Sequence, residues 1–143
     1  MATTRKVHRL NFQPEYDFFI IGIASHVNDY KLTWSLNQQL GFDLMRVDDL
    51  EIVVNKGQVT QRFSRYFFEH EESMISYDLV ANLSENGHLV KEHQNIDYFL
   101  RINGEIGLED FNKLLNEIKC IDGVISAFRI NPATIRHPEV FVF

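Results

Sequence analysis

The stretch DFFIIGIASHVNDYKLTWSLNQQLG (residues 17–41) decides the fold because it joins a buried strand to an amphipathic helix. Residues 18–24 form a short apolar run rich in aromatic and β-branched side chains, which is typical of a strand covered on both faces. Over 29–40 leucines recur every four residues, which predicts a helix, and Gly41 suits its C-terminal end. Between the strand and the helix lies a polar join made of Ser25, His26, Asn28 and Asp29.

A second pattern of the same kind lies near the other end of the chain. IDYFLRIN (96–103) is similar to YDFFIIGI (16–23): each has an acid, then aromatic and then aliphatic residues. Each is followed by a polar loop, a helix that begins with an Asp and an aromatic residue, a glycine and a further strand. We expect the second helix over 108–120 and its strand over 124–130. The buried face of this helix is expected to carry Phe111, Leu114, Leu115 and Ile118.

Two strand–helix–strand units predict an α+β fold, a ferredoxin-like (ACT-like) plait with additional antiparallel strands and both helices on one face of the sheet. If the similarity between the units is coincidental, both helices still lie on one face of an α+β domain. The additional strands are expected over 61–69 and 74–83, as a hairpin, and over 44–54, kinked near Asp48 and Asp49. The tail EVFVF (139–143) is expected to form a last edge strand.

Length and composition describe one domain, residues 1–143, with 45% hydrophobic residues and a formal net charge of −6. A nucleic-acid partner is not expected, because binding phosphates needs a local excess of Lys and Arg, and the basic residues gather only at Arg5, Lys6, His8 and Arg9. The single Cys120 cannot form an intrachain disulfide, and a structural zinc site is not expected. No secretion signal or membrane-spanning run is present, so we expect a cytoplasmic protein.

The polar join at 25–29 has two interpretations. Asn28 or Ser25 can cap the helix that follows, with Asp29 favourable in its first turn. Alternatively, the join with His26 binds an anion at the free N–H groups of the helix. A catalytic triad is not expected, because four residues on one short turn cannot easily align as nucleophile, base and orienting group.

The loop NGEIG (103–107) occupies the corresponding position before the second helix. Its two glycines allow the backbone to approach a ligand, so its candidate ligand-binding residues are Asn103, Gly104, Glu105 and Gly107. An ordinary connecting loop is the alternative. The acidic groups at 48–51 and 69–72 lack the spacing of a calcium loop, and no metal or other cofactor is expected.

The segment LVKEHQNIDYFLRINGE (89–105) resembles a family of uncharacterised bacterial proteins with the signature I-P-E-x-x-x-V-D-Y. The matching positions here are Val90, Lys91 in place of the proline, Glu92, Ile96, Asp97 and Tyr98. DFFIIGIASHVNDYKLTWSLN and RVDDLE also look like that family, so the resemblance extends over nearly the whole chain. It implies a cytoplasmic, single-domain protein and no particular reaction.

These patterns support two functional hypotheses. The first is a non-enzymatic, ACT-like module that forms a homodimer and binds a small anionic ligand or a protein partner. The dimer seam is expected at the apolar tail 139–143, unless the tail pairs within its own chain. The second is a small enzyme that uses His26 with Asp29 or Glu105 as acid and base. Tyr30 and Trp34 flank the leucine stripe of the first helix and are expected to pack with the core. The alternative is that they line a pocket.

Overall fold

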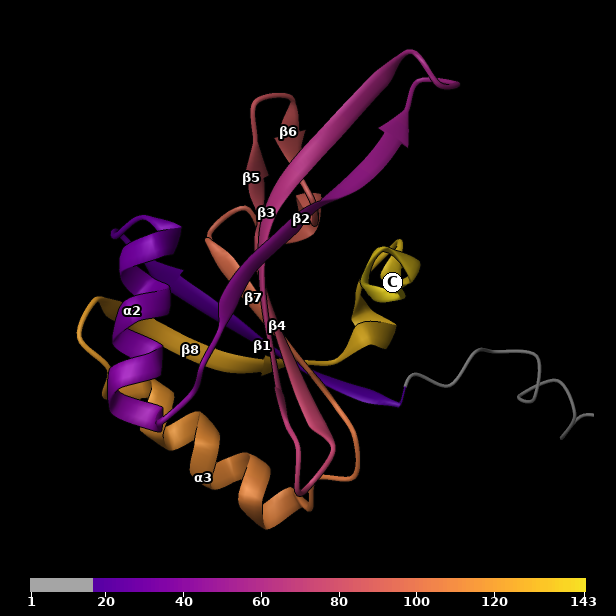
Figure 1. Cartoon of the computed structure of the whole chain (residues 1–143). Coiled ribbons are helices and arrows are strands. Elements are labelled where there is room, and N and C mark those ends of the chain that lie inside the picture. Colours follow the sequence, from indigo (N-terminus) through magenta and orange to yellow (C-terminus); the bar gives the residue numbers. More distant parts are fainter. Residues whose placement is uncertain (1–16) are drawn as a thin grey trace, which may run out of the picture.

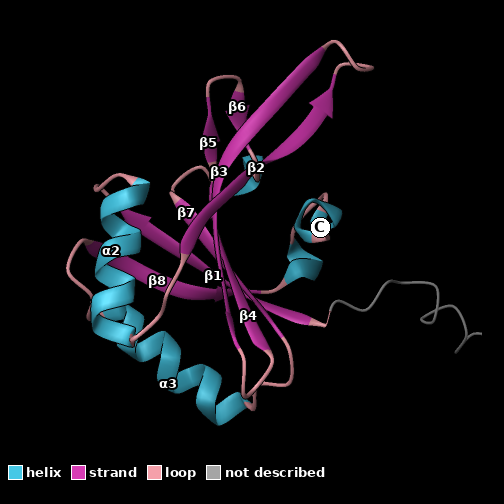
Figure 2. Cartoon of the chain, viewed as in Figure 1, coloured by secondary structure: helices cyan, strands magenta, loops and turns pink. Residues whose placement is uncertain are grey.

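The computed structural model describes residues 17–143, so the basic residues near the N-terminus lie outside the described part. It has one six-stranded antiparallel sheet, two α-helices and a small separate hairpin (Figure 1, Figure 2). The elements follow in the order β1 (Phe18–Ser25), α2 (Asp29–Leu40), β2 (Met45–Val54), β3 (Val59–His70), β4 (Ile75–Ala81), β5 (Leu83–Ser84), β6 (Gly87–His88), η1 (Lys91–His93), β7 (Tyr98–Asn103), α3 (Leu108–Lys119), β8 (Val124–Ile130), η2 (Pro132–Thr134) and η3 (Pro138–Phe141).

The strands of the main sheet lie in the order β2-β3-β4-β7-β1-β8, and all neighbours are antiparallel. The expected α+β class is therefore confirmed. The unit β7-α3-β8 places its two strands on either side of β1, whereas β1-α2-β2 ends at the far edge of the sheet, beyond β7, β4 and β3. The strand order alone therefore does not establish the expected ferredoxin-like plait of two strand–helix–strand units.

Both helices pack against the same face of the sheet, at the left of Figure 1. Leu32 and Leu36 of α2 share one core with Phe111, Leu114 and Ile118 of α3 and with strand residues such as Ile21, Leu100 and Ile102. Leu115 is only partly buried. The expectation for Tyr30 and Trp34 was wrong: their side chains are 70% and 60% exposed, because the stripe that faces the sheet is narrower than the run of apolar residues.

The opposite face of the sheet is covered by irregular segments. Ile20, Phe99 and Val80 of the sheet pack there with Val90 and Ile96 of the loop before β7 and with Ile135 and Phe141 of the C-terminal segment. Alternation of side chains along each strand supplies one residue to each core in turn, as Ile20 and Ile21 do. The two cores explain why the central strands β1 and β7 are apolar on both faces.

Several local expectations are confirmed. The Asn28 side chain accepts a hydrogen bond from the backbone N–H of Lys31 at 2.9 Å, so Asn28 and not Ser25 is the N-cap of α2. Gly41 ends this helix in the left-handed region, with φ of 69°. The register of β2 against β3 shifts between Val47 and Leu50, which corresponds to the expected kink.

Two other expectations need correction. The strand expected over 74–83 ends at Ala81, and Leu83 belongs instead to a separate two-stranded hairpin, β5-β6. The tail 139–143 is not an edge strand: Pro138 begins the 3-10 helix η3, which turns Phe141 into the core and leaves Val142 exposed. A proline-initiated turn, rather than the alternation typical of a strand, therefore sets the conformation of the tail.

Candidate functional site

The polar join after β1 and part of the signature motif line one cavity of about 460 Å³. The strand β1 ends at Ser25 beside the start of β7, because the two strands are antiparallel and Ile23 pairs with Tyr98. The cavity therefore brings together residues far apart in the sequence: Ser25, His26, Asn28, Asp29, Asp97 and Tyr98.

Most of these polar groups are engaged within the chain. The Ser25 hydroxyl donates to the Gly123 carbonyl at 2.6 Å and accepts from the Val27 N–H at 3.2 Å. The Asp97 carboxylate accepts from the Ser25 N–H at 2.8 Å, and the Tyr98 hydroxyl donates to the Val27 carbonyl at the same distance. Ser25, Asp97 and Tyr98 therefore hold the join in place, which is a structural role.

The electrostatics of this cavity do not favour an anion. Burial, aided by the negative charges of Asp29 and Asp97, raises the pKa of Tyr98 to about 12. Burial and Asp29 also raise the pKa of Tyr66, against the opposing effect of Arg46. The two carboxylates therefore place the start of α2 in a negative surrounding.

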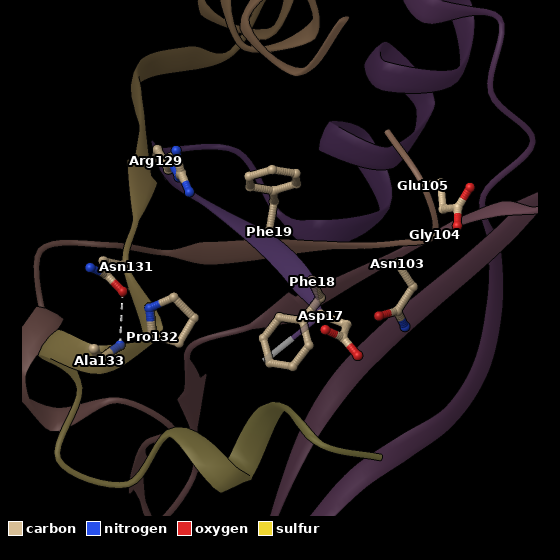
Figure 3. A pocket seen from close by; sticks show the side chains of 10 residues that line it. All are labelled: Asp17, Phe18, Phe19, Asn103, Gly104, Glu105, Arg129, Asn131, Pro132 and Ala133. Carbon is tan, nitrogen blue, oxygen red and sulfur yellow. Dashed lines mark hydrogen bonds between the residues drawn. The ribbon is translucent and has the colours of Figure 1, made fainter. Parts of the chain in front are cut away.

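A second cavity, of about 1030 Å³, lies at the opposite end of β1 (Figure 3). Phe18 pairs with Asn103, which places the loop after β7 beside the start of β1. The cavity is lined by Asp17, Phe18, Phe19, Asn103, Gly104, Glu105, Arg129, Asn131, Pro132 and Ala133. Three of the four candidates from the loop 103–107 are therefore here. The fourth, Gly107, is the N-cap position of α3 and does not line the cavity.

Aromatic rings and a glycine with positive φ define the geometry of the second cavity. The Arg129 guanidinium lies 4.7 Å from the ring centroid of Phe19 and 5.6 Å from that of Phe111. Gly104 has φ of 114°, and a Cβ atom there would lie 3.1 Å from the main chain of Met74 and Ile75. Glycine is thus required for this loop to pass the hairpin β3-β4 at close range.

The two candidate regions do not form one site. His26 follows the end of β1 and Glu105 lies beside its start, so the eight-residue strand separates them by roughly 25 Å. The proposed pairing of His26 with Glu105 was therefore wrong. Asp29 shares a cavity with His26, but its carboxylate accepts a hydrogen bond from the Tyr30 N–H.

The signature-like residues brace the loop that leads into β7. Val90 and Ile96 are buried in the second core, and the Glu92 carboxylate accepts from the Arg136 N–H at 2.6 Å. That hydrogen bond, together with a weak attraction to Arg136, lowers the pKa of Glu92. The sequence analysis missed Asn82, a fully buried residue whose side chain donates to the His93 and Ile96 carbonyls and accepts from the Val90 N–H.

The acidic groups do not form a metal site. Asp49 pairs with Arg46 and Glu51 pairs with Arg62. Within residues 17–143 there is no group of three or more His, Cys, Asp or Glu side chains placed to hold a metal ion, and no helix is long and apolar enough to cross a membrane.

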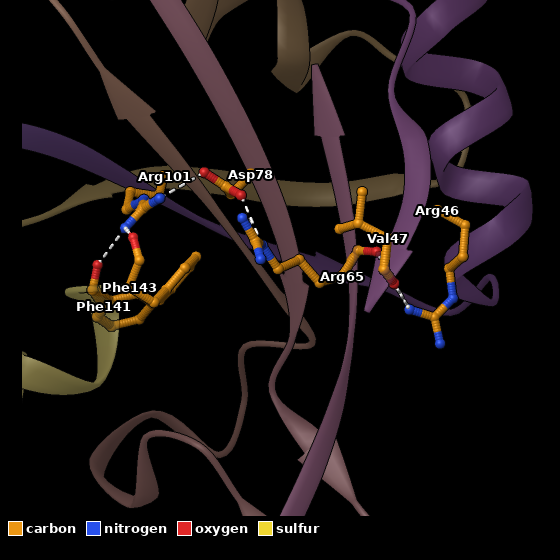
Figure 4. Close-up of polar contacts among 7 residues, drawn as sticks. All are labelled: Arg46, Val47, Arg65, Asp78, Arg101, Phe141 and Phe143. Carbon is orange, nitrogen blue, oxygen red and sulfur yellow. Dashed lines mark hydrogen bonds and ion pairs between the residues drawn. The ribbon is translucent and has the colours of Figure 1, made fainter. Parts of the chain in front are cut away.

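A buried ionic network on the second face was also missed (Figure 4). Asp78 is fully buried and accepts from Arg65 at 2.8 Å and from Arg101 at 2.7 Å. Arg101 also donates to the Phe141 carbonyl at 2.6 Å, and its guanidinium lies 3.8 Å from the ring centroid of Phe143. One feature of the sequence could have indicated this network: each of two apolar strands, YDLVA and YFLRI, contains a single charged residue. Charged side chains are rarely buried without a partner, so two such charges predict a pair.

Comparison of the chain with models of protein families, with curated proteins and with known structures gave no match.

Proposed function

We propose that this protein is a non-enzymatic, ACT-like module that forms a homodimer and binds a small anionic ligand in the cavity at the start of β1. Membership of the family with the I-P-E-x-x-x-V-D-Y signature, and its cytoplasmic location, are part of this proposal. The observation that carries it is the position of Arg129, a cation held over two aromatic rings at the wall of a cavity of about 1030 Å³.

The proposed architecture is a plait of four strands, β8-β1-β7-β4, with the hairpin β2-β3 inserted between α2 and β4. The strand order supports this, because β7-α3-β8 encloses β1 as one strand–helix–strand unit of a plait does. The chain from β1 through α2 then returns to β4 beside β7 after the inserted hairpin. Fold alone does not decide the function, so the proposal depends on the cavity.

The cavity offers chemistry for a small polar molecule rather than for a reaction. Arg129 can bind a carboxylate or a phosphate through two parallel N–H groups. Asn103 and Asn131 can contribute neutral hydrogen bonds, and the Phe19 ring provides an apolar surface. Asp17 and Glu105 lie at the same cavity, so a ligand that also carries an amine, such as a free amino acid, suits it better than a dianion.

The proposal is tested by native mass spectrometry of the protein purified from its own host, followed by titration with amino acids and with inorganic phosphate. A retained or titratable small ligand on the wild type, lost in Arg129→Gln, is the expected result. Arg62→Gln is the matched control, because Arg62 is an exposed arginine on β3 that pairs with Glu51 on β2. Binding that is the same in all three proteins would exclude this cavity, and turnover of a bound compound would exclude the non-enzymatic role.

A further inference from the structure

A third cavity, of about 600 Å³, lies beside the turn between β3 and β4. Its apolar lining consists of Met45, Phe67 and Phe68, and Met45 is 62% exposed. Met45 pairs with Phe67 across β2 and β3, so these two side chains stand together on the face of the sheet opposite the helices. Apolar side chains gathered in an open hollow indicate a place where another segment packs.

Carboxylates surround the apolar residues of this cavity. Asp43, Glu69, Glu71 and Glu72 line it and are exposed, and none of them forms an ion pair within residues 17–143. The lining contains no Lys or Arg. The occupant that complements this cavity is therefore a basic segment that also carries apolar side chains.

The part of the chain before β1 has this character. Residues 5–12 read RKVHRLNF, with three residues that are always charged at neutral pH, Arg5, Lys6 and Arg9, and three apolar ones, Val7, Leu10 and Phe12. The only acid in residues 1–16 is Glu15. Basic and apolar side chains are thus interleaved here, as carboxylates and apolar side chains are in the cavity.

The cavity also lies within reach of this segment. Phe18 pairs with Asn103, Asn103 with Ser76, and Ser76 with Glu69, so the start of β1 and the cavity lie at the same end of the sheet. Three strand spacings, about 14 Å, separate Phe18 from Glu69. Arg9 comes nine residues before Phe18, and an extended chain of that length spans about 30 Å.

We propose that residues 5–12 dock in the cavity beside the β3-β4 turn of their own chain. A short tether gives a segment an effective concentration in the millimolar range, which favours this occupant over a second copy. The cavity at the start of β1 is nearer, but its Arg129 repels a basic segment. The inference goes beyond the proposed function and concerns a different cavity.

Zero-length carbodiimide cross-linking of the full chain tests the contact, because Lys6 is the only lysine in residues 1–16. At low salt we expect Lys6 to be linked to Asp43 or to residues 69–72, as identified by mass spectrometry of the digested protein. Lys6→Arg keeps the charge and should lose these links. A mixture of isotope-labelled and unlabelled protein separates links within one chain from links between two chains.

The rate of tryptic cleavage after Arg9 measures how strongly the segment is held. Replacing Glu69, Glu71 and Glu72 together by Gln removes three exposed ion-pair partners and should accelerate this cleavage about tenfold at low salt. The matched control is Glu85→Gln with Glu117→Gln and Asp122→Asn, which removes three exposed carboxylates outside the cavity and should leave the rate unchanged. High salt should abolish the difference.

Three outcomes would overturn the inference. Equal cleavage rates in the wild type and both triple variants would show that the carboxylates of the cavity do not hold the segment. Links from Lys6 spread evenly over the carboxylates of the chain would assign the cavity to a different partner. Links found only between labelled and unlabelled chains would identify the segment of a second copy as the occupant.

Discussion

At the scale of single residues, the polar groups that matter most are the buried ones. Tyr98 and Asp97 fasten the join after β1, Asn82 fastens the loop before β7, and Asp78 holds two arginines on the second face. Each satisfies backbone or guanidinium donors and acceptors that would otherwise lose their hydrogen bonds on burial. Loss of one partner therefore leaves the other uncompensated.

Tyr98 should make stability depend on pH in the alkaline range. Its pKa is raised from 10.0 to about 12, so the folded state keeps its proton where the unfolded state loses it. This contribution is complete below about pH 10 and is lost as the pH rises toward 12. Tyr98→Phe should reduce the free energy of unfolding by about 1 kcal/mol at neutral pH and flatten its decline above pH 10, as measured by urea unfolding. An unchanged alkaline slope would contradict the assignment to Tyr98.

Asp78→Ala should be among the most destabilising single changes. It removes the one ion-pair partner that Arg101 has within residues 17–143 and leaves that guanidinium buried, at a cost of about 3–5 kcal/mol. Glu51→Ala breaks an exposed ion pair with Arg62 and should cost less than about 1 kcal/mol. Equal midpoints of chemical unfolding for the two variants would show that the buried network stabilises the fold no more than the exposed ion pair does.

At the scale of elements, the ends of helices and the C-terminal segment are set by particular residues. Asn28 caps α2, and Pro138 begins η3. At both positions the chain changes direction, and this change sets the orientation of the side chains that follow.

Asn28→Ala should reduce the free energy of unfolding by about 1 kcal/mol, because the N–H of Lys31 loses its acceptor. His26→Ala, at an exposed neighbouring position, should stay within about 0.5 kcal/mol. Thermal unfolding monitored by circular dichroism measures both. A larger loss of unfolding free energy for His26→Ala than for Asn28→Ala would show that Asn28 is not the residue that caps the helix.

Phe141→Ala should cost about 3–5 kcal/mol, because its fully buried ring packs edge-on against Phe99 with centroids 5.2 Å apart. Its neighbour Val142 is 61% exposed, and Val142→Ala should have little effect. Guanidinium unfolding of the two variants provides the comparison. Similar stabilities would mean that the C-terminal segment does not cover the second core.

At the scale of the whole molecule, the sequence predicts the helices and strands better than it predicts the contacts between them. Periodicity identified α2 and β8 with the boundaries that the structure has, and the α+β class followed from them. The role of the tail did not follow, since a run such as EVFVF has the same apolar content whether it forms a strand or a buried turn. The candidate residues at 25–29 and 103–105 do line cavities, but the distant residues that complete each cavity and the Asp78 network were not predicted. They depend on strand register, which local patterns do not contain.

The central position of β1 has a consequence for how the chain folds. This strand comes first among the described elements, yet both of its neighbours, β7 and β8, come from the last third of the sequence. The meander β2-β3-β4 consists of local hairpins and can form early, but β1 must wait until the rest of the chain has closed around it. Refolding on the millisecond-to-second scale is therefore expected. Changes such as Ile20→Val in β1 should accelerate unfolding while leaving the refolding rate nearly unchanged in stopped-flow experiments.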